Sequence, residues 1–269
     1  MPEGDTIHKI ANWLKPRLSG QPLKAVRFSD PVGSHDCSGR KVSSVRALGK
    51  HLFIDLDNDT ALRSHLGMYG SWHFYPPGAS WKKPKSQASL VLETPETTYV
   101  CFNAKEVEVV SAAGIRDRVL DSRLGPDLIS EEYDAVELER RARHILDGDE
   151  LVADALLDQR IASGIGNVYK SEVLFIEGWL PQTRLSDMPD GSLARCFDLA
   201  GKLLRKNLGG GKRVTRFESD GAGRLWVYGR TGLPCLRCDG RIEARRLGKH
   251  HRGTFWCRSC QVTPPRRGS

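Results

Sequence analysis

The sequence has no long apolar run. None of its 269 residues lies in a stretch close to the ~20 apolar residues that a membrane-spanning helix needs. The N-terminus is polar and lacks the apolar core of a secretory signal, so we expect a cytoplasmic protein. Internal repeats and low-complexity tracts are also absent, and 39% hydrophobic with 28% charged residues is typical of a globular chain.

The sequence contains an odd number of cysteines, seven. Seven cannot all pair within one chain, and clustered cysteines in a cytosolic protein indicate a metal rather than disulfides. Three are scattered and are interpreted as free thiols: Cys37, Cys101 and Cys196. The others follow the spacing C-x2-C-x18-C-x2-C, and they are Cys235, Cys238, Cys257 and Cys260.

This spacing predicts one structural zinc ion. Each C-x-x-C turn can present two thiolates, and two turns complete a tetrahedral Zn²⁺ site with no open position for chemistry. The intervening residues are typical of a β-hairpin with Gly248 and Gly253 near its tip, which would aim Arg252. The alternative is a zinc ribbon that only stabilises the C-terminal tail.

Acidic residues are in the minority. The formal net charge is +8 and the isoelectric point is about 9.2, which favours a polyanionic partner, most simply nucleic acid. Basic side chains concentrate between the two cysteine pairs, where five stand beside two histidines: Arg241, Arg245, Arg246, Lys249 and Arg252, with His250 and His251.

The periodicities indicate an α+β protein. Apolar positions over 3–18 share one helix face, and residues 23–110 contain short, partly alternating strands that predict an antiparallel β-sandwich. Residues 131–208 are mainly helical, and the cysteine-rich tail begins near 225. We therefore predict a sandwich domain over 1–115, a linker over 116–130, a helical domain over 131–224 and a zinc finger over 225–269.

The opening "MPEGDT" places a proline after the initiator methionine. A small second residue normally allows removal of the methionine, which would leave Pro2 as a secondary amine at the N-terminus. Such an amine can attack a carbonyl carbon and form an iminium. The plain alternative is that Pro2 starts a helix, because proline suits the first helical turn.

The stretch "GIGNVYKSE" at 164–172 predicts a tight turn followed by a helix. Gly164 and Gly166 allow close approach of a ligand, and Asn167 would lie at the helix start, where free N–H groups attract anions. These features favour a bound DNA phosphate, with an ordinary helical hairpin as the alternative.

In this order, "MPEGDT", "GKHLF" at 49–53, "GIGNVYKSE" and the four-cysteine hairpin with "RGTFWC" resemble the Fpg/Nei family of DNA glycosylase/AP lyases. The resemblance covers essentially the whole chain and is greatest to the endonuclease VIII (Nei) branch. It implies a monomeric repair enzyme that binds damaged double-stranded DNA and contains a helix–two-turn–helix (H2TH) motif.

The resemblance also implies residue roles. Pro2 would attack C1′ of the damaged nucleoside, and Glu3 would act as a general acid on the sugar. Lys50 would hold a phosphate and assist the first elimination, and Arg252 would assist the second. Asn167 would bind a phosphate from the helical side.

Further residues are assigned through the same resemblance. Arg123 and Asp127 match a family segment near the site, and Met68 and Tyr69 would fill the gap left by the flipped base. Gly67 stands at the position where the Nei pattern has a residue with an amide side chain. For Met68 and Tyr69 the alternative is core packing, and for the lone charges it is a solvated surface position.

Two rival functions remain open. One is an Fpg-type enzyme for oxidised purines, although "MPEGDT" differs from the "PELPE" opening typical of Fpg and the segment 209–229 is short. The other is a non-catalytic damage-binding protein built on the zinc ribbon. The sequence favours bifunctional excision of oxidised pyrimidines with β,δ-elimination.

Overall fold

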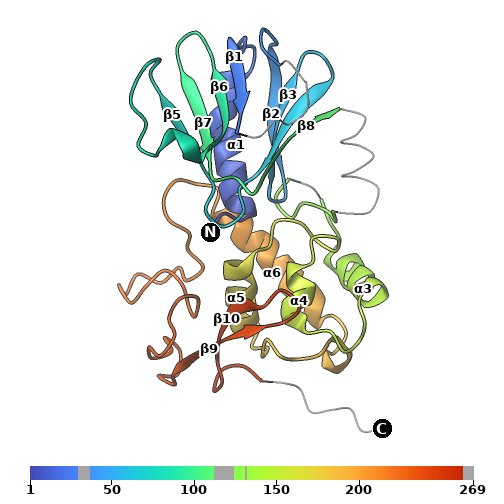
Figure 1. Ribbon diagram of the computed structural model, residues 1–269. Helices are drawn as coiled ribbons and strands as arrows, with labels where there is room; N and C mark the ends of the chain where they lie inside the picture. The colour runs from blue at the N-terminus through green and yellow to red at the C-terminus, as the bar shows by residue number, and fades with distance from the viewer. Residues whose placement is uncertain (30–36, 112–123, 131, 263–269) are drawn as a thin grey trace. The chain divides into compact units, whose positions relative to one another are not determined.

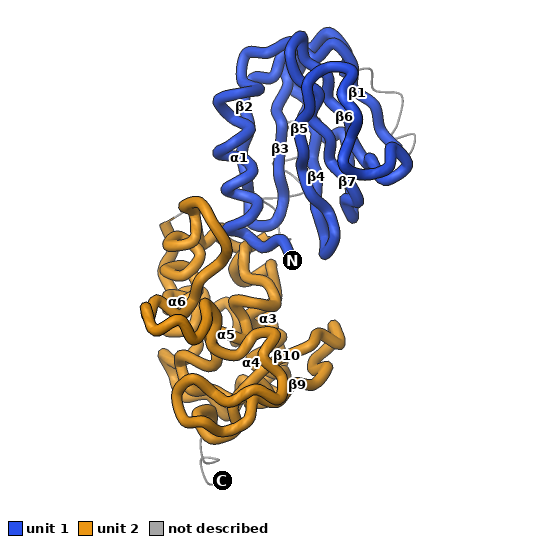
Figure 2. The backbone as a smooth tube through the Cα atoms, turned by 90° about the vertical axis from the view of Figure 1, so that its left-hand side faces the viewer, with its two compact units in different colours: residues 1–123 blue, residues 124–269 orange. Residues whose placement is uncertain are grey.

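The computed structural model describes residues 1–29, 37–111, 124–130 and 132–262. The chain divides into two compact units, Met1–Arg123 and Leu124–Ser269, which Figure 2 shows in separate colours. Within the described ranges, no helix combines the length and the apolar character that crossing a bilayer requires. Each unit has its own core and is considered separately.

The first unit opens with helix α1, Gly4–Leu18. Its buried apolar residues recur every three or four positions, as one helix face requires, and they are Ile7, Ala11, Leu14 and Leu18. Glu3 precedes the helix in an extended conformation, and its carbonyl accepts the N–H groups of Thr6 and Ile7. The helix predicted over 3–18 is confirmed.

Two antiparallel four-stranded sheets complete this unit, in the orders β1-β6-β7-β5 and β2-β3-β4-β8. The strands of the first are β1 Ala25–Phe28, β5 Ser71–Tyr75, β6 Ala88–Glu93 and β7 Thr98–Phe102. Those of the second are β2 Val42–Leu48, β3 His51–Leu56, β4 Thr60–His65 and β8 Glu106–Ser111. Buried residues of both sheets share one core with α1, including Leu52 and Leu90.

Helix α1 and strand β2 pack side by side and are joined at one end (Figure 1). The Gly20 N–H donates to the Val42 carbonyl over 2.7 Å, directly after α1 and at the start of β2. The 15 residues of α1 extend ~22 Å. The 7 residues of β2 extend ~23 Å. The start of α1 and the turn after Leu48 therefore lie at the same end of the unit.

The second unit contains four α-helices and a hairpin among its described residues. The helices are α3 Ala135–Ile145, α4 Val152–Leu157, α5 Asn167–Ile176 and α6 Ser192–Lys206. The hairpin strands are β9 Ile242–Leu247 and β10 Arg252–Cys257 (Figure 1). One apolar core joins the helices, and β10 packs against α5.

The predicted fold class is confirmed: a leading helix with two β-sheets, a helical region and a C-terminal hairpin. The helical region and the hairpin both lie in the unit Leu124–Ser269. The finer domain boundaries stay a prediction.

Candidate functional site

Pro2 and Glu3 lie at the start of α1. Pro2 is half-buried, and Glu3 is fully buried although it is charged in water. Met1 precedes Pro2, so the Pro2 nitrogen is part of a peptide bond in this structure, and only removal of Met1 would release a secondary amine. The buried Glu3 fixes the backbone directly after this nitrogen.

Lys50 lies in the turn between β2 and β3. The turn contains Gly49 with a φ of +55°, a conformation that favours glycine. Because the start of α1 and the turn after Leu48 lie at the same end of the unit, Lys50 lies at the same end as Pro2 and Glu3. Pro2, whose nitrogen becomes an amine only after removal of Met1, therefore shares this end with Glu3 and Lys50.

Two histidines follow Lys50 at this end, and sequence reasoning missed both. The His51 and His65 rings lie 4.9 Å apart on paired strands. Arg63 Nη1 lies 2.8 Å from His51 Nδ1, and Arg63 also forms an ion pair with Glu106 at 2.9 Å. Burial, followed by the charges of His65 and Arg63, lowers the pKa of His51 to about 3. His51 is therefore neutral at pH 7 and accepts the Arg63 N–H.

Met68 and Tyr69 lie on the loop between β4 and β5. They are 50% and 75% exposed, so the alternative of core packing is wrong. Gly67 has a φ of +61°, and a Cβ there would lie 2.9 Å from Lys105 Cβ. A larger residue at position 67 would strain the loop, which explains why glycine stands there. The DNA-wedge role of Met68 and Tyr69 stays a prediction.

Asn167 begins α5 after a turn in which Gly164 has a φ of +109°. Its Nδ2 donates to the Gly253 carbonyl over 2.6 Å, and its Oδ1 accepts from Lys170 Nζ over 2.6 Å. Lys170 is fully buried and also donates to Thr254 Oγ1 over 2.6 Å. The glycine-rich turn and the hairpin are thus bonded to each other, through a lysine that the sequence did not single out.

Glu172 of α5 is fully buried and is a further residue that the sequence did not reveal. It accepts the backbone N–H groups of Trp226, Val227 and Tyr228 over 2.7, 2.9 and 2.8 Å. It also accepts the Thr215 hydroxyl. This carboxylate therefore fixes the segment between α6 and the first cysteine pair.

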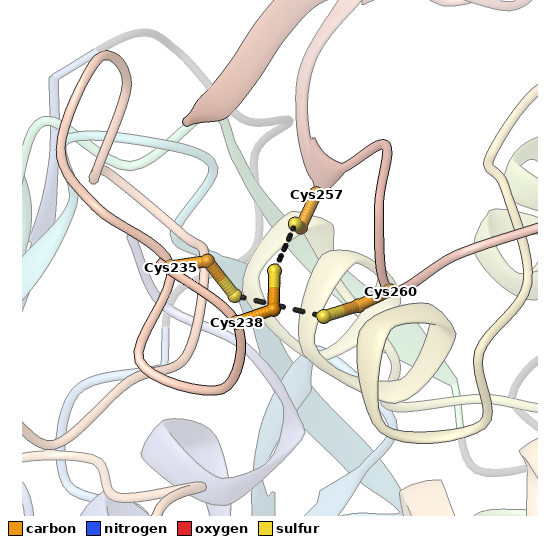
Figure 3. Close-up of side chains that lie close together, drawn as sticks. All are labelled: Cys235, Cys238, Cys257 and Cys260. Carbon is orange, nitrogen blue, oxygen red and sulfur yellow. Dashed lines mark hydrogen bonds between the residues drawn. The ribbon is translucent and has the colours of Figure 1, made fainter. Parts of the chain in front are cut away.

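The four predicted cysteines converge (Figure 3). Their sulfur atoms all lie within 4.8 Å of one another, with Cys235–Cys260 at 3.8 Å and Cys238–Cys257 at 3.5 Å. Four thiolates at Zn–S bonds of ~2.3 Å would lie ~3.8 Å apart at the corners of a tetrahedron. The cluster therefore has the size and the donor set of a structural metal site.

Arg252 is the first residue of β10, where it pairs with Leu247 and is exposed. Asp127 is fully buried, and its Oδ1 accepts the Ile129 N–H over 2.8 Å. Arg123 lies outside the described residues. The structure thus gathers Pro2, Glu3 and Lys50 in the first unit, and Asn167 and the hairpin in the second.

Comparison with known proteins matches both units. The Formamidopyrimidine-DNA glycosylase N-terminal domain family matches residues 1–117, and the Formamidopyrimidine-DNA glycosylase H2TH domain family matches residues 124–219. A "Probable endonuclease 8 2" of Streptomyces coelicolor is 36% identical over 100% of this chain and 97% of its own length. The "DNA-(apurinic or apyrimidinic site) lyase Nei2" of Mycolicibacterium smegmatis is 35% identical over 97% and 99%.

A solved structure shows the same fold. Formamidopyrimidine-DNA glycosylase of Lactococcus lactis, non-covalently bound to DNA containing an AP site, superposes with a TM-score of 0.82 at 22% identity. The match covers 97% of this chain and 99% of that one.

The low pKa of the partly buried His51 predicts acid sensitivity of the first unit. Its pKa of about 3 in the fold lies below the ordinary value of 6.5, so the unfolded chain binds one more proton between these values. His51 should therefore contribute a fall of about 1.4 kcal/mol per pH unit to the free energy of unfolding as the pH drops through this window, in addition to the contribution of His65, whose pKa is lowered to about 4. The neighbouring charges are Lys50, Arg63, His65 and Glu106. His51→Gln should reduce that slope in urea titrations followed by tryptophan fluorescence, and an unchanged slope would contradict the assignment.

Proposed function

Because the chain belongs to the Fpg/Nei family of DNA glycosylases and AP lyases, we propose that it excises oxidised pyrimidines from DNA through Pro2 and then cleaves the strand by β,δ-elimination. The observation that carries the proposal is the gathering of Pro2, Glu3 and Lys50 at one end of the first unit. Full-length similarity to proteins named endonuclease 8, including one from Escherichia coli at 28% identity, supports the Nei-like reading.

The excision step follows from the chemistry of a terminal proline. After removal of Met1, the Pro2 secondary amine attacks C1′ of the damaged nucleoside. The bond from C1′ to the base breaks, and the base leaves with the bonding electron pair and takes up the proton that the Pro2 nitrogen loses. Glu3 donates a proton to the sugar ring oxygen, which opens the ring and leaves an iminium between Pro2 and C1′.

Strand cleavage and DNA binding use the cationic and polar residues. Lys50 binds a phosphate beside the lesion and assists the first elimination, and Arg252 binds the flanking phosphates and assists the second. Asn167 at the start of α5 would offer its backbone N–H to a phosphate, since its side-chain amide is bonded to Gly253 and Lys170. Exposed Met68 and Tyr69 fill the gap that the flipped nucleotide leaves in the stack.

The proposed partner is double-stranded DNA with a damaged base or an abasic site. One Lactococcus lactis relative was solved with DNA containing an oxidised pyrimidine, and another complex holds an abasic site. The rival substrate is an oxidised purine, as the formamidopyrimidine name of the family models indicates. Segment 209–229 is short, and Glu172 holds its C-terminal part through the Val227 N–H. The short segment favours an oxidised pyrimidine over an oxidised purine as the substrate.

We also propose that the four cysteines hold one zinc ion. Cys235, Cys238, Cys257 and Cys260 would bind it as thiolates, and the ion would supply folding energy rather than chemistry. The Cys257 N–H donates to Gln261 Oε1 over 2.8 Å, which links the cluster to the rest of the unit.

An uncleavable N-terminal extension should abolish covalent trapping by borohydride on lesion DNA, because only a free terminal amine can become the iminium nitrogen. Binding of the same DNA should persist. The matched control carries the same extension at the C-terminus and should be trapped like the untagged protein. Full trapping of the N-terminally extended protein would end the proposal.

The same trapping assay separates the rival functions. Duplexes containing an oxidised pyrimidine should be trapped faster than duplexes containing 8-oxoguanine. The reverse order would establish the purine-specific alternative. Binding of lesion DNA with no trapping on any duplex, the abasic one included, would establish a non-catalytic damage-binding protein.

Glu3→Gln should lower base excision by about 10²–10⁴-fold, because it removes a general acid. Nicking of a duplex that already contains an abasic site should decline far less, since no glycosidic bond remains to be broken. Single-turnover assays on the two duplexes measure this difference. Equal losses on both would show that Glu3 does not act as the acid of the excision step.

Cys257→Ser should remove one equivalent of zinc per chain together with DNA binding, because a tetrahedral thiolate site loses most of its affinity with one ligand. Elemental analysis and binding titrations measure both. Cys196→Ala changes a buried cysteine outside the cluster and should keep the metal. If the zinc-free variant binds lesion DNA normally, the ribbon only stabilises the tail.

A further inference from the structure

The tip of the β9–β10 hairpin, residues 248–251, rests on two carboxylates at the start of α4. Gly248 has a φ of +72°, and a Cβ built on it would lie 2.2 Å from Asp154 Oδ1. The Lys249 N–H donates to Asp154 Oδ2 over 3.2 Å, and the Lys249 ammonium forms an ion pair with Glu150. Asp154 is only 8% exposed, and the Glu150 side chain 10%.

The hairpin needs support at its tip, because its metal cluster lies at the other end. Arg252 follows the tip directly, and Cys257 ends the same strand. Strand residues rise ~3.3 Å each, so ~17 Å separate the two, and a 10° rotation about the cluster would move Arg252 by ~3 Å. Functional residues must be held within ~0.5 Å. The cysteine cluster alone cannot hold Arg252 that closely.

We propose that Asp154 and Glu150 are positioning residues that hold Arg252 in its DNA-binding position, an inference that rests on the proposed function. Asp154 fills the space that Gly248 leaves open and binds the next N–H group of the tip. Glu150 binds the Lys249 ammonium and raises its pKa, so Lys249 holds the hairpin rather than a phosphate. Asn167 supports the same strand one residue beyond Arg252, through the Gly253 carbonyl.

If Asp154 acted only through its long-range charge, its substitution would have the opposite effect on DNA affinity from the loss of a positioning residue. Asp154 is an anion next to a surface that would bind a polyanion. Removing its charge should by itself strengthen DNA binding, because a repulsion is lost. Removing a positioning residue should weaken binding. The sign of the change therefore separates the two explanations.

The experiment measures the affinity of the zinc-loaded full-length protein for an abasic-site duplex. Asp154→Asn should weaken binding by about five- to tenfold, because a neutral amide oxygen accepts the Lys249 N–H more weakly than a carboxylate does. The matched control is Asp158→Asn. Asp158 lines the same cavity of about 350 Å³, but it binds Arg160 at 2.6 Å, so this variant also frees a cation. It should bind as tightly as the wild type or more tightly.

A double-mutant cycle tests whether Asp154 acts through Arg252. In an Arg252→Ala background, Asp154→Asn should have no further effect, because the contact that it positions is already gone. A structural defect would add in full to the loss from Arg252→Ala, and that result would overturn the inference. Unchanged or tighter binding by Asp154→Asn alone would overturn it as well.

A second pair of variants disturbs the contact from the hairpin side. Gly248→Ala places a methyl group against the Asp154 carboxylate and should weaken binding as Asp154→Asn does. Gly232→Ala is matched in backbone strain, with a φ of +77°, but has no neighbour within 4 Å of its Cβ. It should bind like the wild type. Equal losses for the two glycine variants would attribute the effect to strain and overturn the inference.

The outcomes also separate this inference from the function beneath it. A variant that keeps its zinc is taken as folded. If Asp154→Asn loses its metal, the comparison of Gly248→Ala with Gly232→Ala decides whether the contact with Asp154 positions Arg252. Absence of borohydride trapping by the wild type would defeat the proposed function itself. Normal trapping, a defect in Arg252→Ala and none in Asp154→Asn would defeat the positioning role alone.

Discussion

The site of the first unit depends on one constraint: its proposed nucleophile is a chain end, with covalent support on one side only. Helix α1 supplies that support. Glu3 is fully buried and its carbonyl accepts two N–H groups, while Ile7 and Leu14 anchor the helix in the core. At its other end the chain bonds to β2 through Gly20. One helix and one strand of matching length therefore bring the terminus to the turn that carries Lys50.

The second unit meets a related requirement, because its proposed phosphate-binding groups lie on a turn and a hairpin rather than inside helices. The Asn167 amide joins the two. Lys170 Nζ donates to the oxygen of the amide, so the Nδ2 faces the Gly253 carbonyl and donates to it. A buried ammonium is tolerated only when hydrogen-bonded. Lys170 therefore fixes the orientation of the amide as well as the distance between the turn and the hairpin.

The parts of the fold that local spacing encodes could be predicted from the sequence. The buried face of α1 and the four cysteines depend on residues a few positions apart. The sandwich was predicted over 23–110 as a whole, but the pairing of its strands was not, because partners such as Ala25 of β1 and Glu93 of β6 lie far apart in the sequence. His51 and Lys170 escaped notice because their roles arise from partners on other elements. The contact of Lys249 with Asp154 joins residues 95 positions apart, and no local pattern reports such a pairing.

Ion-pair partners far apart in the sequence also limit what the net charge of a segment predicts about its contacts with DNA. The basic residues between the two cysteine pairs predict a polyanionic partner, yet one of them, Lys249, forms an ion pair with Glu150. Only cations that neutralise a phosphate release counterions and steepen the salt dependence of binding. A cation already bonded to a carboxylate of its own unit makes no such contribution. The charge of the segment therefore measures its attraction for DNA, whereas the carboxylates determine which cations remain to make the contacts.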